Sequence, residues 1–358
     1  NLRHMDSWFQ SVYDRQKPRF FCVLNENIFH LEVLNMKMIR TENITKKYKR
    51  YKKQEGVTGS IKGLFHREYE EKIAVDAFNM DVDEGEFIGL IGPNGAGKTT
   101  LVKMLTGIIA PTGGEIQVMG FYPNKLEKAF KHQYAVVMGQ KSQLFFELTA
   151  EDTLRLFKEI YRIPEDEYRK NKNFFVELFQ VQELMDVQVR TLSLGERMKM
   201  ELMVALLHNP KILFLDEPTI GLDAVASKQI RTFLKNINES RGTTILLTSH
   251  YMEDIKALCK RSIVVNHGRK IYDGDTDMLF EQYQKSKKMT IYFEHSVEPD
   301  VPKHCRILEK TNDKLVLEIP KQNTEKVLES YIGHYPIRDI GIEEEEIGSV
   351  VERIYKGV

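Results

Sequence analysis

The residues with the clearest chemical meaning are 92–99, which read GPNGAGKT and match the pattern G-x-x-x-x-G-K-[ST]. Glycines let consecutive backbone N–H groups point into one concavity, and a helix that starts after the loop adds positive potential there. A glycine-rich turn with a chance lysine is the alternative. Lys98 supplies a point charge for two phosphates, and the Thr99 hydroxyl suits Mg²⁺. The pattern predicts a nucleotide-phosphate site contacted by Asn94, Gly95, Ala96, Gly97, Lys98, Thr99 and Thr100.

Two carboxylates, Asp216 and Glu217, follow the apolar run 212–215. At the end of a buried strand, Asp216 is placed to hold Mg²⁺ directly or through water, and Glu217 is placed to polarise an attacking water. Taken alone, such a pair is more often the solvated end of a strand. Downstream of a phosphate-binding loop, it predicts metal-assisted hydrolysis of the bound nucleotide.

A scaffold of strands and helices has to position these groups. The apolar run 87–91 predicts a buried strand leading into the loop, and 100–105 predicts the first turns of a helix. Several helices are expected within 150–207, with breaks near Pro164 and around 187–191. Strands that alternate with helices favour a mostly parallel sheet. The other expected strands are 74–82, 115–119, 134–138, 212–215, 244–247 and 263–265.

Further motifs occur in an order that resembles the nucleotide-binding subunit of ATP-binding-cassette (ABC) transporters. Residues 192–196 read LSLGE and resemble the signature LSGGQ, ahead of the two carboxylates. Gln140 matches the Q-loop glutamine, Asp223 matches the D-loop aspartate in 218–223, and His250 matches the switch histidine. Tyr69 lies 29 residues before Lys98, where the family places an aromatic that stacks on adenine. Tyr48, Tyr51 and Phe65 are nearby alternatives. The resemblance covers roughly residues 38–280.

The resemblance implies ATP and Mg²⁺ as cofactors, and it assigns roles to these positions. Gln140 would contact Mg²⁺ or water, and His250 would contact the γ-phosphate. Ser193 and Gly195 would contact the γ-phosphate of ATP held by another subunit, because one chain has one phosphate-binding loop and one signature. A head-to-tail dimer with two sandwiched ATP molecules follows, with a second copy of this chain as the expected partner.

The signature departs from LSGGQ at Leu194 and Glu196. The first change replaces a flexible glycine at a position that, in the family, would lie against the partner's nucleotide. The second places a carboxylate near a triphosphate, although a carboxylate in the first turn of a helix is also favourable to the helix dipole. We expect modest effects rather than loss of function.

Composition limits the class of protein. Acidic and basic residues balance at 52 each, so no global charge draws the chain to nucleic acid or a lipid surface. The cysteines Cys22, Cys259 and Cys305 are scattered without a C-x-x-C pair, which suggests reduced thiols in a cytosolic protein. No apolar run approaches the roughly 18–20 residues of a membrane span, so a membrane role needs other subunits.

The expected domains are an N-terminal extension at 1–35, an α/β ABC ATPase domain at 36–282 with a helical subdomain at about 140–208, and a small α+β domain at 283–358. The extension has the character of a tag remnant or a misassigned start, with a partner-binding arm as the alternative. The basic run that opens 46–72 is read as part of an insertion with a solvated face, rather than as a contact for nucleic acid or anionic lipid.

The C-terminal residues predict a ferredoxin-like arrangement. A hairpin signal at 311–313 separates two of the expected strands. An acidic run at 343–346 is expected to start a second helix that reaches 355. The expected strands are 289–294, 307–310, 314–319 and 337–342, with a first helix at 324–332.

The sub-family resemblance is to ATPases paired with six-helix permeases of the ABC-2 export type, such as viologen and drug exporters. It implies a cytoplasmic subunit, peripheral on the membrane through its permease, that drives efflux and does not bind nucleic acid. Two alternatives stay open: an importer ATPase with a regulatory C-terminal domain, and a soluble cassette protein that acts on ribosomes or DNA. The cargo and the permease are not encoded in this chain.

Overall fold

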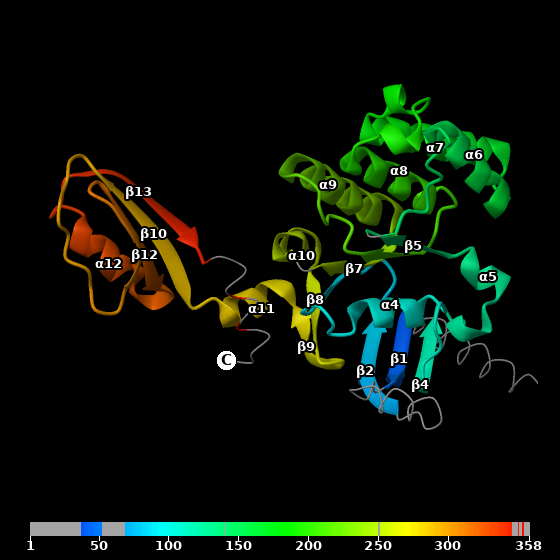
Figure 1. The fold of residues 1–358 in the computed structure, drawn as a ribbon, viewed down its shortest axis with the longest axis horizontal. Coiled ribbons are helices and arrows are strands. Elements are labelled where there is room, and N and C mark those ends of the chain that lie inside the picture. The colour runs from blue at the N-terminus through cyan, green and yellow to red at the C-terminus, as the bar shows by residue number, and fades with distance from the viewer. Residues whose placement is uncertain are drawn as a thin grey trace, which may run out of the picture.

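Figure 1 shows the computed structural model of the chain, in which a cassette of sheets and helices is followed by a smaller C-terminal unit. The structure describes residues 37–51, 69–139, 141–249 and 251–345, together with Val350 and Arg353. The expectations for residues 1–35, for 52–68, for Gln140 and His250, and for most of a helix at 343–355 lie outside these residues.

Six strands form the central sheet in the order β5-β6-β7-β3-β8-β9, and all neighbours are parallel except β8 and β9. The strands predicted at 87–91 and 134–138 are confirmed to the residue. Every residue of β3 is buried, which is why it reads as a continuous apolar run. The bounds are β3 Phe87–Ile91, β5 Tyr134–Met138, β6 Ile212–Asp216, β7 Thr244–Ser249, β8 Arg261–Asn266 and β9 Arg269–Asp275.

The register of this sheet brings the chemical groups to one edge. Ile91 at the end of β3 lies opposite Ser249 at the end of β7, and Asp216 at the end of β6 lies opposite Thr248. Met138, the last residue of β5, is opposite Asp216 on the other side. Because the strands are parallel, the loops that follow them emerge side by side, as ligand sites in such sheets require.

A second, antiparallel sheet has the order β2-β1-β4, so the strands predicted at 74–82 and 115–119 do not join the parallel sheet. Helix α4, which follows the phosphate-binding loop, lies between the two sheets (Figure 1). Its Leu101 and Val102 share one buried cluster with Ile39 of β1 and Ile88 of β3. The bounds are β1 Ile39–Tyr51, β2 Tyr69–Val82, β4 Gly113–Val118 and α4 Lys98–Leu105.

The basic run predicted to belong to an insertion from residue 46 onward is instead part of a strand. β1 continues to Tyr51 and pairs with the beginning of β2, with Lys49 opposite Glu71 and Arg50 opposite Glu70. Lys47 also forms an ion pair with Glu71, at 3.5 Å. Opposite charges across strands stabilise such a hairpin arm, which explains why a highly charged segment is extended here.

The helical subdomain expected at about 140–208 contains α6, α7 and α8, and the predicted breaks are present. Arg162 is left-handed at the end of α6, and Pro164 precedes α7, where its fixed φ suits a helix start. Figure 1 shows these three helices grouped together beyond the β5 side of the sheet. The helices of the cassette are η1 Pro123–Lys125, α5 Lys128–Lys131, α6 Ala150–Tyr161, α7 Glu165–Phe179, η2 Gln182–Leu184, η3 Val189–Thr191, α8 Leu194–Leu206, α9 Ala224–Arg241, α10 Met252–Leu258 and α11 Thr276–Tyr283.

The C-terminal unit is a four-stranded antiparallel sheet in the order β11-β12-β10-β13, packed on helix α12. This is the ferredoxin-like strand order, with residues 294–305 linking β10 to β11 without a helix. Its core is separate from the cassette core and includes Ile291, Leu317 and Tyr331. The bounds are β10 Ser286–Phe293, β11 Arg306–Lys310, β12 Lys314–Pro320, η4 Lys321–Asn323, α12 Thr324–Tyr331 and β13 Ile337–Glu344.

The expectation that a helix starts at Glu343 is wrong, because β13 continues through Glu344. Glu343 and Glu344 lie opposite Lys288 and Lys287 of β10 and form ion pairs with them, at 3.4 and 3.2 Å. These cross-strand charge pairs favour the extended chain. The boundary between domains at 282/283 stays a prediction, and Val350 beyond it packs into the hydrophobic cluster of the cassette.

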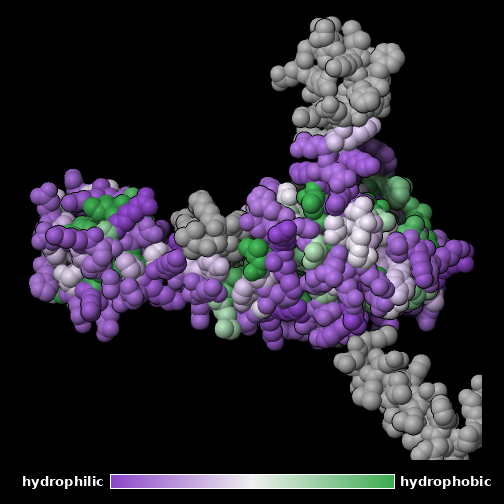
Figure 2. All heavy atoms as spheres, turned by 90° about the horizontal axis from the view of Figure 1, so that it is seen from below, coloured by the Kyte–Doolittle hydropathy of each residue, from purple (hydrophilic) through white to green (hydrophobic). Residues whose placement is uncertain are grey.

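One face of the molecule, seen in Figure 2, is mainly hydrophilic, with apolar side chains in small separate patches. In the part of the chain that the structure describes, no helix combines the length and the apolar character needed to cross a bilayer.

Candidate active site

The phosphate-binding loop joins β3 to α4 in a conformation that only glycine fits at two positions. Gly97 has a φ of +109°, and a Cβ atom there would lie 2.4 Å from the carbonyl oxygen of Ala74 on β2. A Cβ atom on Gly92 would lie 2.4 Å from the carbonyl oxygen of Val265 on β8. Backbone of both sheets therefore touches the loop and holds its shape.

Lys98 occupies the first turn of α4 and is buried, with 6% of its surface exposed. Its Nζ donates to the carbonyl oxygens of Gly92 at 2.7 Å and Pro93 at 3.3 Å, so the ammonium group lies within the curve of the loop. Burial lowers the pKa of Lys98, and the carboxylates of Glu217 and Asp216 oppose that shift. The cation is thus fixed where phosphate oxygens would enter the loop.

Asp216 connects three elements of the site. Its Oδ2 accepts a hydrogen bond from Thr99 Oγ1 at 2.9 Å, and its Oδ1 accepts one from Thr248 Oγ1 at 2.5 Å. The hydroxyl and the carboxylate predicted to hold Mg²⁺ are therefore neighbours, and both are hard oxygen donors of the kind this ion takes. Among the described residues there is no cluster of three or more acidic, histidine or cysteine side chains for a metal. The donor set fits Mg²⁺ held by one carboxylate, one hydroxyl and substrate phosphates.

Glu217 turns away from β6 through a left-handed backbone, with a φ of 55°. This conformation costs a non-glycine residue about 1–2 kcal/mol, and the surrounding contacts have to maintain it. Glu217 N donates to the carbonyl oxygen of Thr248 at 3.0 Å. A Cβ atom on Gly139 would lie 2.2 Å from the Glu217 carbonyl oxygen. The sequence analysis did not single out Gly139, although a glycine directly after a buried strand indicates a place where two backbone segments come close together.

A cavity of about 630 Å³ lies over this loop and the two carboxylates. Four lysines line it, Lys72, Lys98, Lys103 and Lys141, against the two acids Asp216 and Glu217, which suits a polyphosphate. Ala96, also predicted, is buried in the loop and does not line the cavity. The predicted residues that the cavity brings together are Asn94, Gly95, Gly97, Lys98, Thr99, Thr100, Asp216 and Glu217.

Among the described residues, the aromatic side chain that lines this cavity is Tyr48. Tyr69 does not line it, and its contact with adenine stays a prediction. Tyr48 lies opposite Lys72 in the β1–β2 register, and both line the cavity together with Ala74. Tyr69 is the first residue of β2, five residues before Ala74, which places its Cα roughly 16 Å further along the strand. A count of 29 residues back from Lys98 does not reach Tyr48, because the segment 52–68 lies between the two strands of the hairpin.

Comparisons with known proteins agree with this geometry. The ABC transporter family model matches residues 75–220. NatA, an ABC transporter ATP-binding protein of Bacillus subtilis (strain 168), is 33% identical over 220 residues, which are 62% of this chain and 89% of NatA. The Nod factor export ATP-binding protein I of Burkholderia pseudomallei (strain 1710b) is 37% identical over 60% of this chain and 70% of its own length. This chain belongs to the ABC transporter ATP-binding proteins.

A solved structure of the same class supports the assignment at the level of the fold and the ligand. The dimeric cassette MJ0796, in a post-hydrolysis state bound to ADP and Pi, has a TM-score of 0.55 and 25% identity over 66% of this chain and 98% of that one. The present chain is accordingly an ATP-binding and ATP-hydrolysing subunit of the ABC class.

The signature of this ABC ATPase begins α8, and Ser193 is its N-cap. Ser193 Oγ accepts from the backbone N–H of Glu196 at 3.3 Å, while Glu196 Oε2 accepts from Ser193 N and from Ser193 Oγ, both at 2.8 Å. The unusual Glu196 therefore completes a capping box. These hydrogen bonds from Ser193 lower the pKa of Glu196.

The signature and the D-loop of one chain are neighbours. A Cβ atom on Gly195 would lie 3.0 Å from the Cβ of Ala226, and one on Gly221 would lie 3.2 Å from Leu194 Cδ2. Asp223 is the N-cap of α9 and accepts from Ala226 N at 2.8 Å. Ser193, Gly195 and Asp223 do not line the cavity of their own chain.

Two buried carboxylates near the site had no sequence prediction. Asp254 on α10 accepts from Thr219 Oγ1 at 2.5 Å, and it pairs with Arg231 of α9 at 2.7 Å. Glu201 on α8 accepts from Ser142 Oγ at 2.5 Å and from Gln143 N at 2.8 Å, and so ties α8 to the segment that follows Gln140. An acid within the mainly apolar stretch 198–206 was the available signal.

Glu201 predicts a pH effect on stability. Burial raises the pKa of its carboxyl group, and its Oε2 has no hydrogen-bond partner among the described residues. Because the pKa of Glu201 is higher in the folded than in the unfolded protein, its contribution to the free energy of unfolding is complete below the unfolded pKa. This contribution is lost as the pH rises through the folded pKa. Glu201→Gln keeps an oxygen for both donors but does not titrate, so the melting temperature of this variant should gain on the wild type between pH 5 and pH 8.

The matched control is Glu201→Ala, which leaves Ser142 Oγ and Gln143 N without their acceptor and should cost about 1–3 kcal/mol at both pH values. Thermal unfolding of the three proteins at each pH measures the effect. Parallel pH curves for wild type and Glu201→Gln would show that this group does not set the dependence.

Proposed function

We propose that this ABC ATPase drives export through separate membrane subunits of the ABC-2 permease type, lying on the cytoplasmic face of the membrane through them. The observation that carries the proposal is the shared cavity of Lys98, Thr99, Asp216 and Glu217. Its direction, export, is supported by the 37% identity with a Nod factor export ATP-binding protein. ATP binding would close a dimer of cassettes, and hydrolysis followed by product release would reopen it.

The positions of the side chains support a division of roles at the phosphates. Lys98, fixed by the loop carbonyls, would bind the β- and γ-phosphates, and Glu217 would orient and deprotonate the attacking water. Thr99 and Asp216 would hold Mg²⁺, which when bound neutralises charge on the phosphates. Gln140 and His250 keep their proposed roles as contacts to metal or water and to the γ-phosphate.

A second copy of the chain would complete each site. Ser193 and Gly195 stand at the exposed start of α8, where a hydroxyl and helix N–H groups form an anion site, yet they are not at their own cavity. The capping box places the Glu196 carboxylate on the N–H and the hydroxyl of Ser193, so a phosphate of the partner's ATP would compete with this carboxylate for the hydroxyl. The partner's ATP would meet this helix end, with the D-loop beside it.

An apolar patch on the helical subdomain supports docking of a permease. Phe145 and Phe146, in the segment that follows Gln140, are 48% and 45% exposed. The Phe146 ring lies 5.9 Å from the Arg197 guanidinium of α8, so the patch is connected to the signature helix. Adjacent exposed aromatics of this kind are typical of binding surfaces.

Nucleic acid is not expected as the partner, because the basic residues that would favour it are compensated. The basic run at 46–50 lies in β1, and acidic residues of β2 face it across the hairpin, including Glu71 in an ion pair with Lys47.

Tyr48 should contribute to adenine binding, and Tyr69 should not. Loss of a stacking side chain costs about 1–3 kcal/mol per base, so Tyr48→Ala should weaken ATP binding about tenfold or more. Tyr69→Ala should change it by less than about twofold, since its Cα lies a further 16 Å or so along the strand. Titration with a fluorescent ATP analogue measures both constants, and the opposite ranking of the two variants would return the role to Tyr69.

Glu217→Gln should bind ATP but lose turnover by about 100-fold or more, because a general base is removed while the phosphate contacts stay. Glu84→Gln is the matched control, since Glu84 is exposed at the turn that precedes β3, the other end of that strand. Steady-state ATPase rates and nucleotide retention measure the result. Wild-type turnover in Glu217→Gln would exclude this residue as the base.

The export assignment is tested by purifying the tagged full chain from mild-detergent membrane extracts while following ATPase activity. A permease of several membrane spans should copurify, and Phe145→Ser with Phe146→Ser should reduce its recovery. Ile108→Ser, which changes an exposed apolar residue away from the patch, should not. Recovery of ribosomes or nucleic acid alone would contradict the transport function while leaving the ATPase intact.

A further inference from the structure

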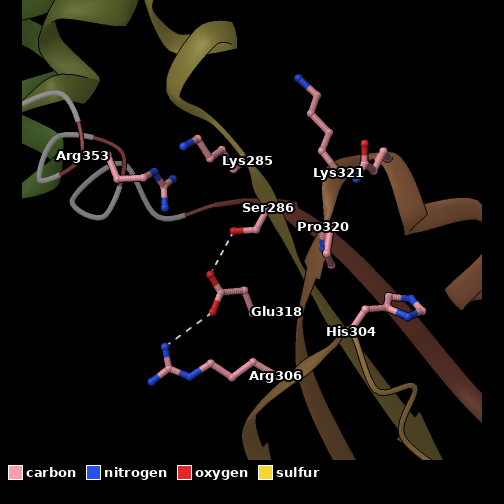
Figure 3. A pocket seen from close by; sticks show the side chains of 9 residues that line it. Lys285, Ser286, His304, Arg306, Glu318, Pro320, Lys321 and Arg353 are labelled. Carbon is pink, nitrogen blue, oxygen red and sulfur yellow. Dashed lines mark hydrogen bonds and ion pairs between the residues drawn. The ribbon is translucent and has the colours of Figure 1, made fainter. Parts of the chain in front are cut away.

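The C-terminal unit contains a cavity of about 700 Å³ that the ATPase site does not use. It lies where β10 begins and β12 ends, and Ser286 and Glu318, which are hydrogen-bonded to each other, form part of its lining (Figure 3). Among the residues that the structure describes, four cations line it against one carboxylate, that of Glu318, and they come from separate parts of the chain: Lys285, Arg306, Lys321 and Arg353.

Two described carboxylates, at and beside this cavity, each pair with an arginine. Glu318 Oε1 accepts from Ser286 Oγ at 3.0 Å, and its Oε2 is 3.8 Å from Arg306 Nη1, as the dashed lines in Figure 3 show. Glu345, whose side chain is buried, accepts from Ser286 N at 3.4 Å and pairs with Arg353. Arg353 also donates through Nε to the carbonyl oxygen of Tyr283 at 3.0 Å. These two acids therefore compensate Arg306 and Arg353 rather than the lysines.

Lys285 and Lys321 are the cations left over. Among the described residues, neither side chain forms an ion pair or a hydrogen bond. Their backbones are joined, because Lys321 N donates to the Lys285 carbonyl oxygen at 3.0 Å, next to the paired residues Ser286 and Pro320. The two lysines without an acidic partner are thus attached to adjacent backbone positions at the end of the β10–β12 pair. They lie beside a concave surface, which strengthens the electrostatic potential of their ammonium groups.

We propose that this cavity binds a ligand through a phosphate group, with Lys285 and Lys321 as its main contacts. Lysine ammonium groups bind phosphate as point charges, and the exposed guanidinium of Arg306 at the rim can donate further hydrogen bonds. The cavity volume is in the range of sites for whole small molecules, so there is room for more than the phosphate group itself. A soluble phosphorylated compound and a phospholipid headgroup share this chemistry.

The test uses the full chain carrying Lys98→Ala, so that the phosphate-binding loop does not compete for the probes. Inorganic pyrophosphate is titrated by calorimetry, and vesicles of phosphatidylglycerol or of phosphatidylcholine are used in sedimentation. Lys285→Ala with Lys321→Ala should weaken binding about tenfold or more. Lys287→Ala with Lys288→Ala removes the same amount of charge from β10, which begins directly after Lys285; these lysines pair with Glu344 and Glu343, so the change should leave binding unchanged.

The outcomes separate the sources of the phosphate. Cavity-dependent binding of pyrophosphate assigns a soluble ligand, and cavity-dependent sedimentation with phosphatidylglycerol but not phosphatidylcholine assigns a headgroup. Binding of neither probe, or equal losses in the two double variants, overturns the proposal. Thermal unfolding of each variant confirms that its C-terminal unit is folded. The result is independent of the export function, because nothing in it requires hydrolysis or a permease.

Discussion

The carboxylate of Asp216 is the interaction on which the cassette depends. It ends β6, and it accepts hydrogen bonds from Thr99 at the start of α4 and from Thr248 near the end of β7. A partly buried carboxylate is costly unless its lone pairs are satisfied, so the loop helix and two strands are held in one register around it. The same register places Glu217 next to Thr248 and brings both acids under the phosphate-binding loop.

Close approaches of backbone to backbone extend this arrangement to the second sheet. Gly97 faces the carbonyl of Ala74 on β2, Gly92 faces that of Val265 on β8, and Gly139 faces that of Glu217. Each contact excludes a Cβ atom, so the shape of the loop is set by the strands around it rather than by the loop alone. The antiparallel sheet is therefore part of the active site, since the strands that support the loop also supply Tyr48 and Lys72.

Charge is organised differently in the two parts of the chain, although the total is balanced. The ATP cavity has more lysines than carboxylates, as a site for a polyphosphate needs. In the C-terminal unit, the lysines of β10 that face β13 are paired with acids across the strands, whereas Lys285 and Lys321 at the end of the ladder have no such partner within the part of the chain that the structure describes. The buried carboxylates of Glu201 and Asp254 have another role, because Glu201 ties α8 to the segment after β5 and Asp254 ties α10 to α9 and to Thr219.

The sequence by itself determined the features that depend on a few consecutive residues. The motif at 92–99 required the strand and helix found on either side of it, apolar runs marked β3 and β5 to the residue, and Pro164 marked the start of α7. Only the tertiary structure decided which residues meet. It separated the strands into two sheets, placed Tyr48 rather than Tyr69 at the cavity, bound Glu196 into a helix cap, and extended β13 through Glu344. The physical reason is the range over which each signal acts. Propensity and apolar runs depend on a few consecutive residues, whereas strand pairing and shared cavities depend on contacts between distant segments. An intervening segment such as 52–68 changes the distance between two strands in the sequence without altering how they pair.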